Sequence, residues 1–507
     1  MRRTPVKAIA KHSSFMRIAL LGWFALAIGA MLALRSLDIG LGQGSFAYRY
    51  SEMQSQRMLR AFWLAPIAAT VVLSITWSAK RRKIAPIVAI TAVILLSVWT
   101  FFAPIKAVTQ HSFNLRSPSH DGAFVDELYG MTTLREYLRD FDQRIQRTPA
   151  ELRGTRVISN PPGTTILFYA VAYVWRPNVE SPGWLERILQ RYYDVNEPDA
   201  LVTTMVTVQI AMLLTVLWSL AAIVWYRVAR MFLSPASAML CVLIAWFNPS
   251  TAHFVPGKDP AHLLTVGLMA WTWLAAWKRD KPTLAALSGA VLIVGATIGL
   301  IHVWVAAALV VACAWDSLAR RESATHFVLR LLLPFAAGGF AILIAIYLIT
   351  DWNLAKTFFT VWRRFSQIQR ELALDHTIWF VIGIPLFLLF VSPALFLFGG
   401  SAIRRRRPMN FGARLSVVTV LIMATSYVVG VTYELPRLWV VFVPLLTLGL
   451  MTASPFRHLN HEGRALRAAI FIAIAHIAFT AAHWSLLDAR ESEHRLSGPA
   501  PTFFGKT

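Results

Sequence analysis

Long apolar segments separated by clusters of Lys and Arg constrain the fold of this chain more than any other feature. Apolar runs recur from Ala19 to Leu487, and many have the length of about 20 residues that an α-helix needs to cross a bilayer. Loops rich in Lys and Arg favour the cytoplasmic side of a membrane, so these clusters assign a side to every loop. The pattern predicts an all-α polytopic membrane protein. The clusters lie at Lys80–Lys83, Lys278–Lys281, Arg320–Arg321 and Arg404–Arg407.

Composition agrees with this class and argues against others. Of the 507 residues, 56% are hydrophobic and 15% are charged, with a mean hydropathy of +0.54. An outer-membrane barrel is excluded because its strands alternate apolar and polar residues, whereas these runs are continuous. Much of the net charge of +23 lies in short loops beside the runs, where it orients helices and meets anionic headgroups. We therefore expect membrane lipids as partners and no nucleic acid. Cys241 and Cys313 lie within apolar runs, which makes a disulfide framework or a metal site implausible.

The basic clusters also predict how the chain is threaded. The apolar runs between them give about 13 spans, with the N-terminus cytoplasmic and the C-terminal tail outside. A single membrane domain then accounts for residues 1–507, and its largest outer loop covers residues 105–200. Within that loop, the apolar stretch 164–175 is too short for a span and is typical of a re-entrant or interfacial helix.

The same threading gathers the polar motifs on the outer face. In the large loop, Asp121 and the pair Asp126 and Glu127 precede the segment 131–145, whose apolar residues recur at helical spacing. We expect an amphipathic helix there, lying on the membrane surface. A carboxylate held above such a helix can act as a general base that deprotonates an acceptor hydroxyl. The alternative is that the acidic pair only favours a helix N-terminus through the macrodipole.

A short motif follows in the same loop. Asn160, Pro161, Pro162 and Gly163 end any regular structure and then start an apolar helix. The two prolines fix the direction in which the helix starts, and the glycine allows a turn or a close backbone approach. Taken alone, the motif predicts only the start of a helix.

Two further outer segments carry charges at the mouths of predicted spans. Lys258 and Asp259 are costly at that depth unless they are paired or face a polar cavity. Glu434 and Arg437 precede a later span, and the planar guanidinium of arginine suits the oxygens of a phosphate. For the first pair, the alternative is that Lys258 only extends to the membrane interface beside its counter-ion Asp259. For the second pair, the alternative is that Arg437 and Trp439 form an interfacial anchor.

Other polar residues receive a structural interpretation. The apolar block 284–315 predicts a tight hairpin of two helices around Gly295 or Gly299, and His302 within it is interpreted as a packing histidine. The arginines between Arg135 and Arg156 are interpreted mainly as a solvated helix face. There is no Walker motif, paired metal-ligand cluster or dinucleotide fingerprint, so we expect no cofactor and leave a need for a divalent cation open.

The order of these features resembles the GT-C superfamily, integral-membrane glycosyltransferases that use polyprenyl-phosphate-linked sugars. The similarity lies in the outer loop with Asp126 and Glu127, the amphipathic helix, the Pro-Pro-Gly element before a short jaw-like helix, and Glu434-x-x-Arg437 at a late span. It covers most of the chain as an order of features. The chain departs from the family at Asn160, where His often precedes the two prolines, and in its early spans, since the acidic motif usually follows the first one.

The resemblance implies a role for each candidate residue. Asp126 is expected to be the general base, with Glu127 beside it and Asp121 as the competing base. The remaining roles are donor-phosphate contacts for Lys258 and Arg437, donor-sugar contacts for Asp259 and Glu434, and a jaw element formed by Asn160, Pro161, Pro162 and Gly163.

We therefore expect a hexosyl or pentosyl transferase at the extracytoplasmic face of a bacterial inner membrane. It would move a sugar from a polyprenyl-phosphate donor to a lipid, glycan or protein acceptor. The main alternative is a lipid-linked glycan flippase or a transporter, whose helices would carry charges near the membrane midplane and often show repeated halves. A structural or assembly protein would need none of the outer motifs.

Overall fold

The fold is α-helical wherever the chain is described. One antiparallel pair of two-residue strands, β1 (Arg49–Tyr50) and β2 (Leu487–Asp488), is the exception among the described residues. The predicted all-α class is thus confirmed for this part of the chain. The computed structural model describes residues 21–23, 25–34, 36, 49–50, 69–70, 72–75, 77, 121–129, 131, 133–147, 156–174, 183, 187, 198–255, 257–371, 376–391, 395, 409–428, 435–459 and 464–488.

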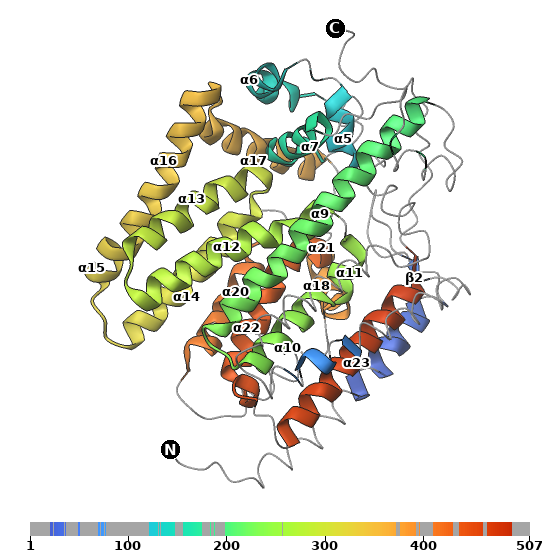
Figure 1. Cartoon of the computed structure of the whole chain (residues 1–507), viewed down its shortest axis with the longest axis vertical. Helices are drawn as coiled ribbons and strands as arrows, with labels where there is room; N and C mark the ends of the chain where they lie inside the picture. The colour runs from blue at the N-terminus through green and yellow to red at the C-terminus, as the bar shows by residue number, and fades with distance from the viewer. Residues whose placement is uncertain are drawn as a thin grey trace.

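Figure 1 shows how the helices are arranged. Three short non-α turns interrupt them: η1 (Val328–Leu332), a π-turn, and the 3-10 turns η2 (Trp439–Phe442) and η3 (Pro455–Arg457). The α-helices are α5 (Gly122–Tyr129), α6 (Leu134–Arg144), α7 (Gly163–Val174), α9 (Pro198–Arg230), α10 (Pro235–Trp246), α11 (Pro249–Phe254), α12 (Lys258–Arg279), α13 (Pro282–Ile298), α14 (Ile301–Ala319), α15 (Ala324–Phe327), α16 (Leu333–Thr350), α17 (Leu354–Glu371), α18 (His376–Phe390), α20 (Phe411–Ala424), α21 (Leu435–Leu438), α22 (Val443–Ala453) and α23 (Arg464–Leu486).

Three described segments are long and apolar enough to cross a membrane by length and composition. They are Thr204–Arg230, Ile301–Ala319 and Ala324–Thr350. The expected number of about 13 spans is not confirmed: several predicted runs fold as shorter helices, and others lie outside the described residues, as at 84–104. One of these, α10, has 12 residues and rises only about 18 Å, which is less than the hydrocarbon thickness of a bilayer, about 30 Å.

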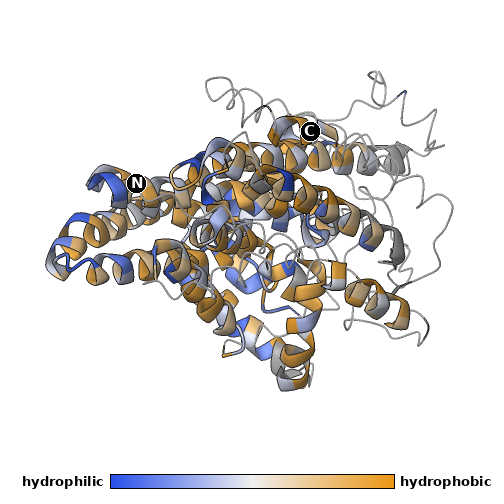
Figure 2. Ribbon diagram, turned by 90° about the horizontal axis from the view of Figure 1, so that it is seen from below, coloured by the Kyte–Doolittle hydropathy of each residue, from blue (hydrophilic) through white to orange (hydrophobic). Residues whose placement is uncertain are grey.

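The segment Ala324–Thr350 exposes most of its apolar surface. Only 6% of its most apolar window is buried, and Phe340, Ile344 and Leu348 are 64%, 56% and 73% exposed. A helix that is apolar all round requires apolar surroundings. Hydrophobic residues predominate along most of the helices in Figure 2. Both observations indicate association with a membrane.

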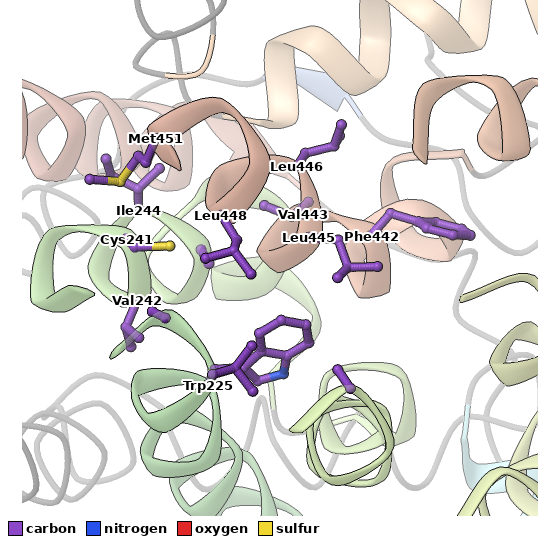
Figure 3. Close-up of a cluster of buried hydrophobic side chains, with 14 of the residues drawn as sticks. Trp225, Cys241, Val242, Ile244, Phe442, Val443, Leu445, Leu446, Leu448 and Met451 are labelled. Atoms are coloured by element: carbon purple, nitrogen blue, oxygen red, sulfur yellow. The ribbon is translucent and has the colours of Figure 1, made fainter. Parts of the chain in front are cut away.

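The main core lies between helices rather than against a sheet. Side chains from α9, α10, η2 and α22 meet there, as Figure 3 shows for Trp225, Ile244, Phe442 and Leu448. Cys241 belongs to the same packing, and both it and Cys313 are buried free thiols. The neighbours of Cys241 are apolar, which fits its interpretation as a packing residue.

The helices of the large predicted loop gather at one end of the molecule, together with α17 (Figure 1). The predicted amphipathic helix is α6, in which the side-chain oxygen of Thr133 accepts a hydrogen bond from the backbone N–H of Glu136 and caps the N-terminus. Tyr137, Leu138 and Phe141 form its buried face. The short apolar stretch is α7. The predicted hairpin is also confirmed, since α13 and α14 are joined at Gly299 and Leu300.

Candidate functional site

Five charged side chains form a buried group where the start of α5, the segment before α7, the start of α12 and α21 meet. They are Asp121, Arg156, Lys258, Asp259 and Arg437, and none is more than 9% exposed. We refer to these five residues as the charged cluster. Four of them are residues that the sequence singled out, in three segments far apart along the chain.

Asp259 is the centre of this cluster. Its Oδ1 lies 3.1 Å from Nζ of Lys258, and its Oδ2 lies 3.2 Å from Nε of Arg437 and 3.8 Å from Nη1 of Arg156. Burial alone would raise the pKa of the Asp259 carboxyl, but the charges of Lys258, Arg437 and Arg156 outweigh burial and hold that pKa well below its usual range. Asp259 is therefore an anion that holds three cations together.

Asp121 joins α5 to α12. Its Oδ2 accepts a hydrogen bond of 2.7 Å from the backbone N–H of Lys258, and its Oδ1 lies 3.7 Å from Nη1 of Arg156. A Cβ added to Gly257 would lie 3.3 Å from Oδ2 of Asp121, so glycine leaves room for this carboxylate beside the helix start. The predicted competing base thus also has a positioning role.

Asn160 holds Lys258 from the other side. Its Oδ1 accepts a hydrogen bond of 3.0 Å from Nζ of Lys258, while its Nδ2 donates to the carbonyl oxygen of Arg156 at 2.8 Å. Nζ of Lys258 also lies 5.6 Å from the ring centroid of Phe124, a cation–π contact. The side-chain amide therefore links the ammonium group of Lys258 to the backbone of Arg156.

The Pro-Pro-Gly element packs against the end of α13. Pro161, Pro162 and Gly163 are buried, and a Cβ on Gly163 would clash with the carbonyl oxygen of Thr297. Glycine is needed here because the first turn of α7 touches the backbone of α13. The element fixes the segment that carries Asn160.

The charged cluster carries excess positive charge. Its three cations and two carboxylates sum to a net charge of +1. Burial lowers the pKa of the Lys258 ammonium; the carboxylates of Asp259 and Asp121 oppose this shift, and Arg156 and Arg437 add to it. Adding an anion would favour the charged form of Lys258. The two guanidinium groups provide the planar donor geometry that phosphate oxygens accept.

The remaining predicted residues lie elsewhere or outside the described part. Glu127 binds Arg144 through two contacts, Oε2 with Nε and Oε1 with Nη2, the second at 3.1 Å. This pair joins α5 to α6 and involves none of the five residues of the charged cluster. Asp126 is half-buried on α5, and Glu434 lies outside the described residues.

Sequence reasoning missed two buried residues. Arg156 was interpreted as part of a solvated face, but it is 6% exposed and contacts two carboxylates. His262 was not singled out, although it follows Asp259 by three residues on the same helix, a spacing that places both on one face. That spacing is the signal that could have revealed it.

Within the described part of the chain, no group of three or more His, Cys, Asp or Glu side chains could hold a metal ion. Comparison with models of known protein families finds no match for this chain, and no curated protein matches it.

Proposed function

We propose that this chain is a GT-C-like membrane glycosyltransferase that moves a sugar from a polyprenyl-phosphate donor to an acceptor. The observation that carries the proposal is the convergence of Asp121, Lys258, Asp259 and Arg437 in one buried cluster with a net positive charge. Unrelated surface motifs would have no reason to meet. A donor phosphate requires such cations, because negative charge develops on it as the sugar departs.

The reaction is a displacement at the anomeric carbon of the donor sugar. A bond forms from the acceptor oxygen to this carbon, and the bond from the carbon to the phosphate oxygen breaks. The phosphate oxygen keeps the electron pair and leaves as part of polyprenyl phosphate, and the acceptor proton passes to a carboxylate. The resemblance implies inversion of the donor bond. Arg437 and Lys258 stabilise the departing phosphate, and Asp259 holds both in place.

We assign the base to Asp126 and a positioning role to Asp121. Asp126 is half-buried, with its Oδ2 atom buried, and is less buried as a residue than Asp121. Asp121 is 6% exposed and is engaged by the backbone of Lys258 and by Arg156. Asp126→Asn should therefore abolish transfer and leave donor binding intact. Asp121→Asn should weaken donor binding as well, because it releases the start of α12.

The proposed location is the extracytoplasmic face of a bacterial inner membrane, with about 13 spans and jaw-like helices α6 and α7 in the outer loop. Donor lipids diffuse in the bilayer and present their phosphate at the interface. This location suits the gathering of α5, α6, α7 and α17 at one end of the helices (Figure 1).

Sugar transfer by the purified full-length protein tests the proposal. The detergent-solubilised chain is offered a panel of radiolabelled polyprenyl-phosphate sugars with membrane extract as acceptor, beside Asp126→Asn and Arg437→Ala. We expect labelled product from one donor and none from either variant. Arg139→Ala is the matched control, since Arg139 is an exposed arginine on α6 that pairs with Asp140.

Two results would count against the enzyme. Saturable donor binding that requires Arg437, without turnover with any acceptor fraction, would favour a flippase. If neither donor binding nor turnover is detected, the charged cluster is not a phosphate site, and transport of another substrate is favoured.

A further inference from the structure

Two buried histidines lie next to the charged cluster, and the proposed reaction makes no use of them. His262 is on α12, three residues after Asp259 and four after Lys258, so the three side chains share one face of the helix. His302 is in the first turn of α14, and its ring centroid lies 5.3 Å from that of His262. The two histidines are 3% and 0% exposed. They therefore extend the cluster into the interior of the helices.

The contacts of His302 need more protons than its neutral ring supplies. Its Nδ1 lies 2.7 Å from the carbonyl oxygen of Gly299; this oxygen only accepts, so Nδ1 carries a proton. Its Nε2 lies 2.7 Å from Oγ1 of Thr265, and that hydroxyl also lies 3.0 Å from the carbonyl oxygen of His262. When the ring of His302 is neutral, the hydroxyl of Thr265 has one proton for two acceptors. It can donate that proton either to Nε2 of His302 or to the carbonyl oxygen of His262, but not fully to both.

An imidazolium satisfies all three contacts. Its Nδ1–H donates to Gly299, its Nε2–H donates to the hydroxyl of Thr265, and that hydroxyl donates to the carbonyl of His262. Each of the three short contacts then has its own proton. The geometry around His302 is that of a site for an additional proton.

His262 lies between this site and the charged cluster. Both of its ring nitrogens are buried and have no hydrogen-bond partner among the described residues. A Cβ on Gly299 would lie 2.7 Å from its Cε1, so the ring fits closely against the hairpin turn. A buried imidazole without hydrogen bonds is costly, and a proton in transit or a bound polar group would give its nitrogens a partner.

The charges around His302 disfavour the imidazolium until an anion arrives. The ring is fully buried in the first turn of α14, where the positive end of the helix dipole opposes an imidazolium, and Lys258 on the neighbouring α12 adds a second positive charge. Neither α13 nor η2 has a titratable side chain. Helix α17 also meets this end of α14, where Trp362 stacks on Trp304, and it carries Arg363 and Arg364 directly after Trp362. The pairs of Arg414 with Asp316 and of His326 with Asp280 lie near the opposite end of α14. An anion beside Lys258 would offset this repulsion.

We propose that binding of an anionic phosphate group at the charged cluster is coupled to uptake of one proton by His302, with His262 as the intermediate carrier. The inference rests on the proposed function, because it takes the cluster as a phosphate site. The proton comes from solvent and bonds to Nε2 of His302, and no other bond changes. Because binding takes up a proton, affinity rises as the pH falls, by up to about tenfold per pH unit.

Calorimetry of a soluble probe tests this coupling. Geranyl phosphate, a short isoprenyl monophosphate, is titrated into the detergent-purified full chain near pH 7 in two buffers with different ionisation enthalpies. The difference in heat gives the number of protons taken up. We expect up to one proton per bound probe in the wild type, less in Thr265→Val and none in His302→Gln. His476→Gln is the matched control, since His476 is a buried histidine on α23, which packs on α10 and α11, and it should keep the uptake.

The outcomes separate the two proposals. Probe binding without proton uptake in the wild type would overturn the coupling and leave the phosphate site standing. Uptake that persists in both His302→Gln and Thr265→Val would overturn the assignment to His302. Absence of probe binding in the wild type at any pH would overturn the phosphate site and the coupling together.

Discussion

At the scale of single residues, Asp259 has the most contacts in the charged cluster. This carboxylate contacts Lys258, Arg437 and Arg156 within 4 Å, and removing one partner of a buried ion pair leaves uncompensated charge. Asp259→Asn should therefore lower the free energy of unfolding by about 3–5 kcal/mol. Thermal unfolding in detergent measures the effect. Asp140→Asn is the control, because Asp140 pairs with an exposed arginine and should change little.

The same residue predicts a pH dependence. The pKa of Asp259 is depressed in the folded state, so its stabilising contribution is complete above the unfolded value of about 3.9. It is lost as the pH falls below that value towards the folded-state pKa. The difference in unfolding temperature between wild type and Asp259→Asn should be constant at neutral pH and shrink in acid. A difference that grows as the pH falls would contradict the assignment.

Glu127 should behave differently from its neighbour. Its carboxylate is bound by Arg144, and successive residues of a helix point about 100° apart, so it cannot share the direction of Asp126. Glu127→Gln should weaken the contact between α5 and α6 and lower the unfolding temperature, while donor affinity stays close to that of the wild type. Loss of donor binding at unchanged stability would place Glu127 in the site instead.

At the scale of helices, close packing through glycines joins α13 to α16. A Cβ on Gly289 would clash with the carbonyl oxygen of Phe335, and one on Gly338 with that of Ala286. Small residues at such contacts let membrane helices approach closely. Gly338→Leu should force the pair apart and destabilise the chain by about 1–3 kcal/mol or more. The thermal shift should be absent in Gly29→Ala, because a Cβ there meets no atom within 4 Å.

Most helices could be predicted from sequence, but their lengths could not. Apolar periodicity located α6, α7 and the α13–α14 hairpin. The apolar run that contains Cys241 forms a helix that ends at Trp246, because Asn248 caps the next helix, α11, by accepting a hydrogen bond from the backbone N–H of Thr251. Hydropathy also does not distinguish lipid-facing side chains from those of α10, which are all buried by other helices.

At the scale of the whole molecule, the sequence singled out four of the five residues that the fold gathers in the charged cluster. It did not predict the contacts between the segments of the cluster, because several of these join residues more than a hundred positions apart, as Asp121 with Lys258 and Asp259 with Arg437. The burial of Arg156 has the same origin, since only the folded chain places it between Asp121 and Asp259. The charged cluster is therefore a product of the tertiary fold rather than of any one motif.

The central claim is that this cluster binds the phosphate of a lipid-linked sugar, and equilibrium binding tests it most directly. A radiolabelled polyprenyl-phosphate sugar is titrated against purified wild type, Arg437→Ala and Arg139→Ala at fixed salt. A charge-assisted hydrogen bond contributes about 1.5–3 kcal/mol, so Arg437→Ala should weaken binding by about 10- to 150-fold, with Arg139→Ala unchanged. Equal affinity in all three proteins would contradict the account.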